Sequence, residues 1–490
     1  MGSGEDCDWL EGGAAAALQE MKAVLPAVVL TVFLPGGEAA TSTGQPPNLV
    51  VMVSDNQPWW AMGCAGNRII STPHLDQLAR EGVRFRNAFV TTPICAASRA
   101  SLLTGLYRRK HGFTFGTPPF AAKLAAGSYP AQLHQGGYRT ALIGKLGLET
   151  NGRLMIEAEE SSLAAMFDHF DQFEHWGRSG PRGYFVRGKD GTRRHLTEVT
   201  GDKAVAFLEN CRPKEPFCLT LCFNAPHAQD DDPQQYFWPT RFDHLYEEAT
   251  IPPPRNAEPA FFAAQPGFIR NSLGRERWRW RFDTPSKYQA MMKGIYRMVS
   301  GVDHVVGRVR SVLQDRGLHR NTILVFTSDN GMFFGERGLS DCWLLYEECL
   351  RVPLLFYDPR GDGGVVREEM VLNLDLAPTL LALAGVDREQ KHPVDGRSVI
   401  PLLRGEKRDG WREDFLCEHL FEHGKIPRSE GVRTRRWKYI RYIDQVPVRE
   451  ELYDLQADPT ERVNLAGEGQ HADRLRELRE RCESLIGASG

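Results

Sequence analysis

Four short apolar runs along the chain are each followed at once by polar residues. The runs cover residues 49–53, 141–143, 217–223 and 323–326. Because they are rich in β-branched residues and do not alternate between apolar and polar positions, they are typical of central strands in a sheet covered on both faces. We therefore expect an α/β fold in which these runs form the middle of an open sheet.

Helical spacing is found between and after these runs. A helix is predicted over residues 73–81, with Thr72 as its cap, Pro73 in its first turn and Gly82 at its end. Further helices are predicted over residues 286–314, 374–384 and 471–486. By contrast, residues 228–285 are rich in Pro, Trp, Phe and Arg without a period, which predicts a loop-rich insertion close to a substrate.

The polar residues that follow the four apolar runs are candidates for a common site. They are Asp55 and Asn56 after the first run, Lys145 after the second, His227 after the third, and Asp329 and Asn330 after the last. Sites in open α/β sheets form beyond the carboxyl ends of the strands, so we expect these residues to converge. Asp-Asn pairs are also common turn formers, which is the alternative interpretation. Carboxylate and amide oxygens suit Ca²⁺ or Mg²⁺ rather than Zn²⁺.

A nucleophile, a fixed cation and a helix start lie close together in the segment CAASRASLLTG, residues 95–105. Helical spacing of Leu102, Leu103 and Leu106 places Cys95 at or just before a helix N-terminus, where anions are favoured. The alternative is that Cys95 is a buried cysteine serving only as a small apolar residue.

This segment resembles the sulfatase signature C-x-(P/A)-S-R-x-x-x-L-T-G, with Ala97 in place of the commoner proline. The resemblance continues in the family's order from about residue 48 to residue 464. Its landmarks are PNLVV at 47–51, DNQ at 55–57, GK at 144–145, APH at 225–227, SDNG at 328–331, YEE at 346–348 and ELYDL at 451–455. It implies an alkaline-phosphatase-like mixed sheet flanked by helices. After Asp395 the pattern changes to short β-rich pieces, so we place a boundary near residue 390, between a catalytic domain over residues 41–390 and a smaller C-terminal α+β subdomain over residues 391–490.

The resemblance also implies an activity, namely hydrolysis of the sulfate ester of a carbohydrate. In sulfatases a formylglycine-generating enzyme oxidises the signature cysteine to formylglycine, whose hydrate attacks sulfur in a double displacement. One divalent cation assists this reaction. It is usually Ca²⁺, and Mg²⁺ is the other candidate. The implied cation ligands are Asp55, Asn56, Asp329, Asn330 and the modified Cys95.

Three further residues receive roles from the resemblance. Arg99 holds or polarises a formylglycine oxygen, Lys145 neutralises sulfate charge, and His227 protonates the departing oxygen. A histidine at this place can instead be an ordinary loop residue.

Two positions depart from the family pattern. Gly147 stands where sulfatases commonly have a histidine, and Cys342 stands where they commonly have a sulfate-binding lysine. A lost transition-state contact costs about 2.7–4 kcal/mol. The departures therefore leave two alternatives open: a phosphodiester or phosphonate hydrolase of the same superfamily, and a catalytically impaired protein that binds sulfated glycans.

Residues 274–282 alternate arginines with aromatic residues. One interpretation is a binding segment for a polyanionic sugar, in which arginines pair with sulfate and tryptophans stack on a ring. The other is a surface strand with one solvated charged face.

The composition of the chain limits the kinds of partner that we expect. The chain has 490 residues and a net charge of -3, which removes any general electrostatic argument for a nucleic-acid partner. Of its ten cysteines, Cys218 and Cys222 lie in an apolar run and are expected in the core.

The N-terminus carries the one candidate targeting segment. Met21 and Lys22 precede an apolar run over residues 23–34 and a small-residue region at 35–40, a pattern typical of a signal peptide. The run is too short for a stable membrane span. We therefore expect a leader over residues 1–40, Met21 as the true start, and a periplasmic or secreted protein; the alternative is an Ala/Gly-rich leader on a cytoplasmic protein.

Overall fold

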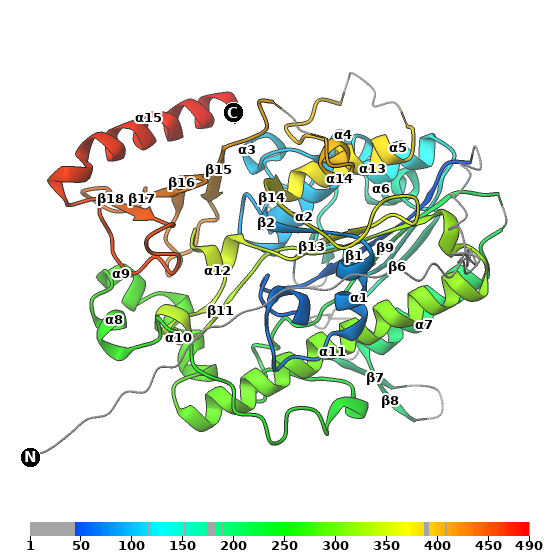
Figure 1. The fold of residues 1–490 in the computed structure, drawn as a ribbon, viewed down its shortest axis with the longest axis horizontal. Helices are drawn as coiled ribbons and strands as arrows, with labels where there is room; N and C mark the ends of the chain where they lie inside the picture. The colour runs from blue at the N-terminus through cyan, green and yellow to red at the C-terminus, as the bar shows by residue number, and fades with distance from the viewer. Residues whose placement is uncertain are drawn as a thin grey trace, which may run out of the picture. The chain divides into compact units, whose positions relative to one another are not determined.

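The computed structural model describes most of the chain after the proposed leader (Figure 1). The described residues are 45–489 except 116–117, 151–152, 174–182, 188–190, 213, 387–391 and 407–408. The predicted leader, residues 1–40, lies outside this part of the chain.

The main sheet is mixed and has eight strands in the order β14-β2-β13-β10-β1-β9-β3-β6. The four predicted strands are its middle: β10 (Thr322–Ser328), β1 (Asn48–Ser54), β9 (Phe217–Cys222) and β3 (Arg139–Gly144), all parallel to their neighbours in this group. The outer strands are β2 (Val83–Phe89), β6 (His169–Gln172), β13 (Leu354–Tyr357) and β14 (Val365–Leu372). Since β13 runs antiparallel to both β10 and β2, the mixed sheet expected from the resemblance is confirmed.

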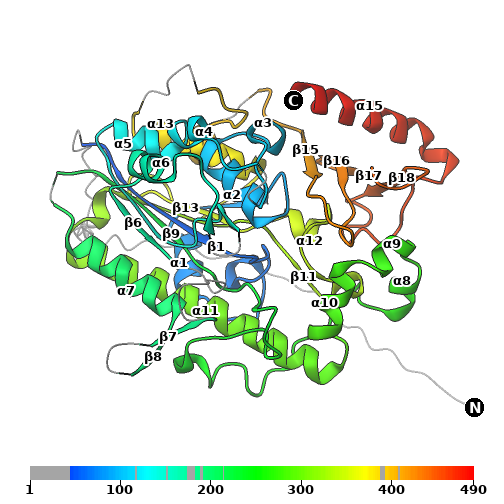
Figure 2. The ribbon, with the colours of Figure 1, turned by 180° about the vertical axis from the view of Figure 1, so that it is seen from behind.

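Helices cover both faces of this sheet, which explains why its central strands are apolar throughout (Figure 2). Leu49, Val51 and Val53 of β1 point into one core, whereas Val50 and Met52 point into the other. The first core is closed by α2 (Cys95–Thr104), α5 (Tyr129–Gln135) and α13 (Leu376–Leu383). The second is closed by α1 (Pro73–Glu81), α7 (Leu196–Glu209) and α11 (Pro285–Asp315).

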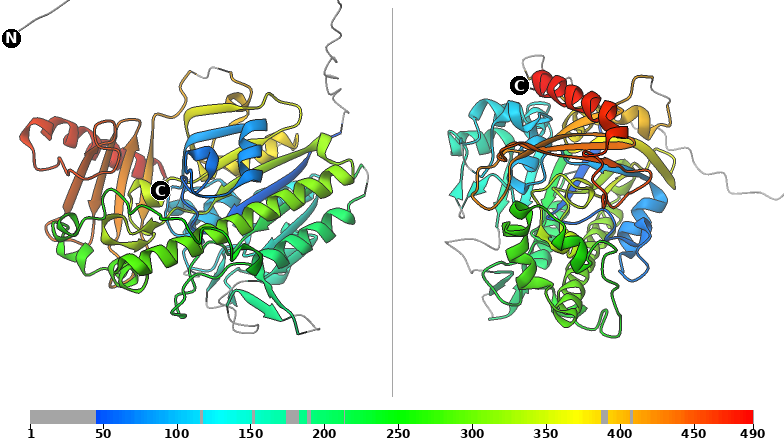
Figure 3. Two further views of the ribbon diagram at one scale, coloured as in Figure 1. Left: turned by 60° about the horizontal axis from the view of Figure 1, so that its bottom comes forward. Right: turned by 90° about the vertical axis from the view of Figure 1, so that its left-hand side faces the viewer.

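A smaller antiparallel sheet with one long helix follows near the C-terminus, as the resemblance implied (Figure 3). Its strands are β15 (Asp414–His419), β16 (Ser429–Thr434), β17 (Trp437–Tyr442) and β18 (Arg449–Asp454), in chain order. Alternate residues such as Leu416 and Val432 pack against α15 (Ala472–Ser489). Residues of the opposite face, such as Phe415 and Cys417, join the first core of the main sheet.

Two buried polar clusters connect this small sheet to the rest of the molecule. Tyr346 donates to Glu451 at 2.7 Å, which joins two landmarks of the sequence pattern. One residue on, Glu347 begins α12 (Glu347–Leu350) and pairs with Lys438 of β17 at 2.8 Å. Lys438 also pairs with Glu461 at 2.7 Å, and neither side chain is exposed.

Two expectations about local structure need correction. Thr72 makes no capping hydrogen bond; instead Asp303 of α11 accepts from the backbone N–H groups of His74 and Leu75, at 3.0 and 2.7 Å. Residues 228–285 are loop-rich at first but end in short helices: η2 (Thr240–Phe242), α8 (Pro259–Ala263), α9 (Gly267–Arg270) and α10 (Leu273–Arg281).

Other expectations are confirmed. The long helix predicted at 286–314 is α11, and Cys218 and Cys222 are buried in β9. Of the helices in the described residues, none combines the length and apolar character that crossing a bilayer requires.

Candidate active site

The carboxyl ends of β1 and β10 bring the predicted cation ligands together. These strands are parallel, with Ser54 opposite Ser328, so the Asp-Asn pairs that follow them are neighbours. The backbone N–H of Asn56 donates to Asp329 Oδ1 at 3.0 Å, and Asn330 Nδ2 donates to Asn56 Oδ1 at 2.5 Å. Asn56 adopts a left-handed conformation, φ 65°, which asparagine tolerates better than most residues.

The oxygen atoms at this edge fit a hard divalent cation. Asp55 Oδ1 and Asn330 Oδ1 are buried and accept no hydrogen bond. An acceptor left without a partner in the interior is costly unless a cation or another donor satisfies it. No cluster of three or more His, Cys, Asp and Glu that could hold a metal is found among the described residues. Asp55, Asp329 and the two asparagines offer oxygen atoms, the ligand type that Ca²⁺ and Mg²⁺ take.

Two buried cations balance the carboxylates. Lys145 Nζ donates to Asp55 Oδ2 at 2.5 Å, and Arg99 Nε donates to Asp329 Oδ2 at 2.7 Å. Arg99 also donates to the carbonyl of Lys145 at 2.7 Å, which ties the two cations together. Burial acts to lower the pKa of Lys145, but Asp55 and its neighbours raise it above its ordinary value, so Lys145 stays charged.

Cys95 is the first residue of α2 and is partly exposed. Arg99, one helical turn later, lies on the same face of the helix. Burial of the sulfur, the largest effect, raises the pKa of Cys95 to about 12 despite the opposing effect of Lys145. The unmodified residue is therefore a thiol at neutral pH and a weak nucleophile.

His227 follows β9, and its Nδ1 donates to the carbonyl of Ala228 at 2.6 Å. Burial, with Lys145 as a second cause, lowers the pKa of His227 to about 4, whereas Asp230 and Asp341 act to raise it. The imidazole is thus neutral at pH 7. An anion beside it would favour its protonated form.

Of the two departures from the family pattern, the one at residue 147 has a structural reason. Gly147 has φ +87°, and a Cβ there would lie 2.0 Å from Cδ of Arg99. Arg99 therefore occupies the space that any side chain at residue 147 would need. Cys342 is buried directly after β12 (Ser340–Asp341), and this burial, the largest effect, raises the pKa of its thiol well above the ordinary value. No contact among the described residues explains a cysteine at this position.

Residues 274–282 form most of α10, so the surface-strand interpretation is wrong. Arg277 pairs with Asp230 at 2.6 Å and with Asp341 at 2.5 Å. Arg281, which has no exposed side-chain surface, pairs with the same two aspartates. These two guanidinium groups therefore neutralise aspartates and anchor the loop that carries Cys342.

Two residues that support the site were not singled out from the sequence. The Ser98 hydroxyl donates to the carbonyl of Asp329, and Asn373 Nδ2 donates to Ser98 Oγ at 2.9 Å. Asn373 directly follows the buried end of β14, the same signal that identified the other polar residues. Ser98 lies inside the signature itself.

Comparison with known proteins supplies relatives along most of the chain. Residues 47–386 match the family model described as sulfatase, and residues 335–487 match that described as N-sulphoglucosamine sulphohydrolase, C-terminal. An N-acetylglucosamine-6-O-sulfatase of Bacteroides thetaiotaomicron is 30% identical, over 89% of this chain and 86% of the relative. An arylsulfatase of Clostridium perfringens is 26% identical, over 88% of this chain and 93% of the relative.

Solved structures show the same fold. A complex described as containing its substrate D-glucosamine-2-N,6-O-disulfate has a TM-score of 0.75 and 26% identity, covering 91% of this chain and 98% of that one. A phosphonate monoester hydrolase of Agrobacterium radiobacter has a TM-score of 0.73 and 22% identity, covering 91% of this chain and 96% of that one.

Proposed function

The chain belongs to the sulfatase family and is a sulfuric ester hydrolase, and we propose that it removes sulfate from a sulfated carbohydrate. The observation that carries the proposal is the position of Cys95, at the start of α2 beside the buried group of Asp55, Asp329, Arg99 and Lys145. The relative that acts on N-acetylglucosamine-6-O-sulfate supports a sugar as the alcohol part of the ester.

We further propose that Cys95 is converted to formylglycine by a formylglycine-generating enzyme. The high pKa of the thiol supports this, because the unmodified residue is a poor nucleophile. Formylglycine supplies, when hydrated, a hydroxyl group that can attack sulfur.

In this proposal Asp55, Asn56, Asp329 and Asn330 hold a calcium or magnesium ion, and the modified Cys95 is its fifth ligand. The unpartnered oxygens of Asp55 and Asn330 support that assignment. Such an ion supplies positive charge for the sulfate ester.

The remaining residues have roles that their contacts support. Lys145 and Arg99 stay charged in a buried site, where they stabilise developing negative charge strongly. Arg99 also orients Asp329 and the backbone of Lys145. His227 is neutral until an anion binds, takes up a proton in that complex, and delivers it to the leaving alcohol oxygen.

The decisive experiment compares Cys95→Ala with Cys342→Ala, a matched change at a buried cysteine near the site. The proteins are produced with a formylglycine-generating system and assayed for sulfate release from a set of sulfated monosaccharides. We expect Cys95→Ala to lose at least 1,000-fold in kcat/KM, the scale of removing a nucleophile, and Cys342→Ala to stay within about threefold of wild type.

Mass spectrometry of the wild-type Cys95 peptide should show a loss of about 18 Da, the difference between a CH₂SH and a CHO group. Active protein carrying only unmodified thiol would disprove the role of formylglycine. Turnover of a phosphonate monoester with no sulfate release would assign the chain to the phosphonate hydrolases instead. Binding of sulfated glycans with no hydrolysis of either ester would identify the impaired relative.

The cation site has its own prediction. Asp329→Ala should reduce bound calcium or magnesium to less than about a tenth of wild type, because it removes a charged ligand and leaves Asp55 to hold the ion with neutral oxygens. Asp315→Ala, at the exposed end of α11, is the control and should bind as wild type does. Elemental analysis measures both, and unchanged metal content in Asp329→Ala would refute the assignment.

We also propose the domain division and the location expected from the sequence: a leader over residues 1–40, a catalytic domain over 41–390, a C-terminal subdomain over 391–490, and export to the periplasm or the outside. N-terminal sequencing of the mature protein from a native-like host tests the leader.

A further inference from the structure

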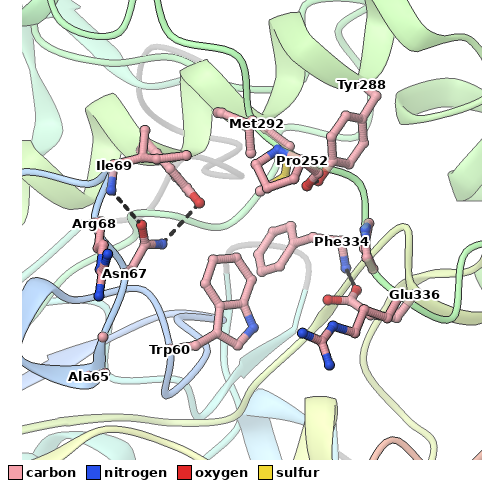
Figure 4. Close-up of a pocket in the computed structure, with 15 residues that line it drawn as sticks. Trp60, Ala65, Asn67, Arg68, Ile69, Pro252, Tyr288, Met292, Phe334 and Glu336 are labelled. Carbon is pink, nitrogen blue, oxygen red and sulfur yellow. Dashed lines mark hydrogen bonds between the residues drawn. The ribbon is translucent and has the colours of Figure 1, made fainter. Parts of the chain in front are cut away.

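A cavity of about 690 Å³ lies beside α11, and its lining includes none of the site residues named above (Figure 4). Its volume is in the range of small-molecule pockets, about 300–1,000 Å³. The lining is rich in aromatic rings, among them Trp60, Tyr288, Tyr296 and Phe334.

The cavity belongs to the same edge of the main sheet as the active site. Trp60 lies in the loop that follows β1, four residues after Asn56, and Phe334 lies four residues after Asn330 beyond β10. The two rings meet edge to face at 5.8 Å. The loops that carry the candidate cation ligands therefore also carry the wall of this cavity.

The aromatic wall is rigidly held. The ring of Trp60 also packs against that of Tyr296 of α11, with 6.4 Å between the ring centroids. The Tyr296 hydroxyl accepts a hydrogen bond from Asn67 at 2.9 Å. Tyr288 donates to the carbonyl of Pro252 at 2.9 Å. Trp60 is only partly buried, so it offers ring surface to a ligand, as Figure 4 shows.

The rim of the cavity is positively charged. Arg68 and Arg255 line it, both are exposed, and neither forms an ion pair with a described residue. Among the described residues that line the cavity, Glu336 alone is acidic, and it accepts from the backbone N–H of Phe334. Burial and nearby Glu348 raise the pKa of Glu336 to about 8, so it is mostly neutral at pH 7 and does not repel an anion.

From these observations we propose that the cavity binds a second sugar residue of a sulfated oligosaccharide, with Trp60 against the ring and Arg68 and Arg255 on its sulfate groups. The C–H groups of a sugar face carry slight positive charge and suit the negative face of an aromatic ring. Guanidinium groups suit sulfate oxygens through paired hydrogen bonds. This inference rests on the proposed function, since it makes the chain selective for oligosaccharides over single sulfated sugars.

The test compares two substrates with the same protein variants. The substrates are 4-nitrophenyl sulfate, which has no second sugar residue to place in the cavity, and a sulfated tetrasaccharide. For Trp60→Ala and for the double variant Arg68→Ala/Arg255→Ala, we expect kcat/KM for the tetrasaccharide to fall at least tenfold, mainly through KM. We expect kcat/KM for 4-nitrophenyl sulfate to change less than twofold.

A control double variant, Arg320→Ala/Arg404→Ala, removes the same charge from two exposed arginines outside the cavity. Its kcat/KM for either substrate should differ from that of wild type by less than twofold. Equal losses for both substrates in the cavity variants, or no loss for the tetrasaccharide, would overturn the inference.

Direct binding separates this inference from the proposed function. If wild-type protein cleaves no sulfate ester, the proposed function fails, and calorimetric titration with the tetrasaccharide decides the second question. Two results together support the cavity as a sulfated-sugar site. The Arg68→Ala/Arg255→Ala variant binds the tetrasaccharide at least tenfold more weakly than wild type does, and wild type binds the desulfated sugar at least tenfold more weakly than the sulfated one. Absence of binding, or equal binding of the desulfated sugar, overturns it.

Discussion

At the scale of single residues, Gly147 is the most informative position. The family pattern makes its glycine look like a missing catalytic histidine, but the structure gives the glycine a function of its own. Its backbone passes so close to Arg99 that no Cβ fits, and its φ of +87° is unfavourable for other residues. Glycine in place of histidine at residue 147 therefore leaves the space that Arg99 needs to reach Asp329.

This contact can be tested with two glycine-to-alanine variants. Gly137 has φ +84° with nothing within 4 Å of an added Cβ, so Gly137→Ala carries only the backbone strain. It should cost about 1–2 kcal/mol of stability and leave activity unchanged. Gly147→Ala adds a clash with Arg99 and should lower kcat/KM for sulfate ester hydrolysis about 100-fold. Similar kinetics for the two variants would show that Arg99 tolerates the extra methyl group.

At the scale of elements, helices in this molecule are fixed by contacts from distant parts of the chain. The N-terminus of α1 is capped by Asp303, far along the chain on α11, while Thr72 instead donates to Asp76 at 3.1 Å and accepts from the N–H of Gly63. Asp303 is 2% exposed, and this burial, the main cause, raises its pKa to about 7 from 3.8.

The raised pKa gives a pH dependence of defined sign. Between about pH 4 and 7 the folded state holds a proton on Asp303 that the unfolded state has released, so this residue's contribution to stability falls as pH rises. Asp303→Asn keeps an acceptor oxygen but removes the titration. Urea unfolding at pH 4.5 and pH 7.5 should therefore show that wild type loses about 1–3 kcal/mol more than the variant over this interval. Parallel changes in both proteins would exclude Asp303 as the source.

At the scale of the whole molecule, the C-terminal sheet and the main sheet share one core and a buried charge cluster. Residues such as Phe415 and Tyr442 lie in the first core, and Lys438 pairs with both Glu347 and Glu461. Because separating the sheets would expose this apolar face and uncover the charges, we expect the described part of the chain to unfold in a single cooperative transition.

The variants Lys438→Met and Arg436→Met compare the stability lost with a buried ion pair and with an exposed one. Lys438 lies in β17, and Arg436 directly precedes that strand. Removal of Lys438 leaves the unexposed Glu461 side chain without its partner cation and should cost about 3–5 kcal/mol. Arg436 is 55% exposed where it pairs with Asp454, so its loss should cost less than about 1 kcal/mol. Denaturant unfolding measures both. Equal losses would show that the cluster does not hold the two sheets together.

The sequence by itself determined the features that depend on short stretches of chain. Central strands such as β1 and β10 were visible because strands buried on both faces need a continuous apolar run, and α11 because its apolar face repeats with the helical period. The positions of Asp55 and Asp329 followed from one rule, since polar residues directly after parallel strands meet at one edge of the sheet.

Tertiary structure alone decided the features that depend on which distant residue fills a space. The sequence near Gly147 does not predict that Arg99 lies against it. The sequence near Thr72 does not predict that Asp303 caps the helix. Residues 274–282 have mixed local preferences, and their helix is fixed by Arg277 and Arg281 reaching aspartates elsewhere in the chain. Each of these outcomes is set by packing and charge pairing between segments far apart in sequence, which local periodicity does not encode.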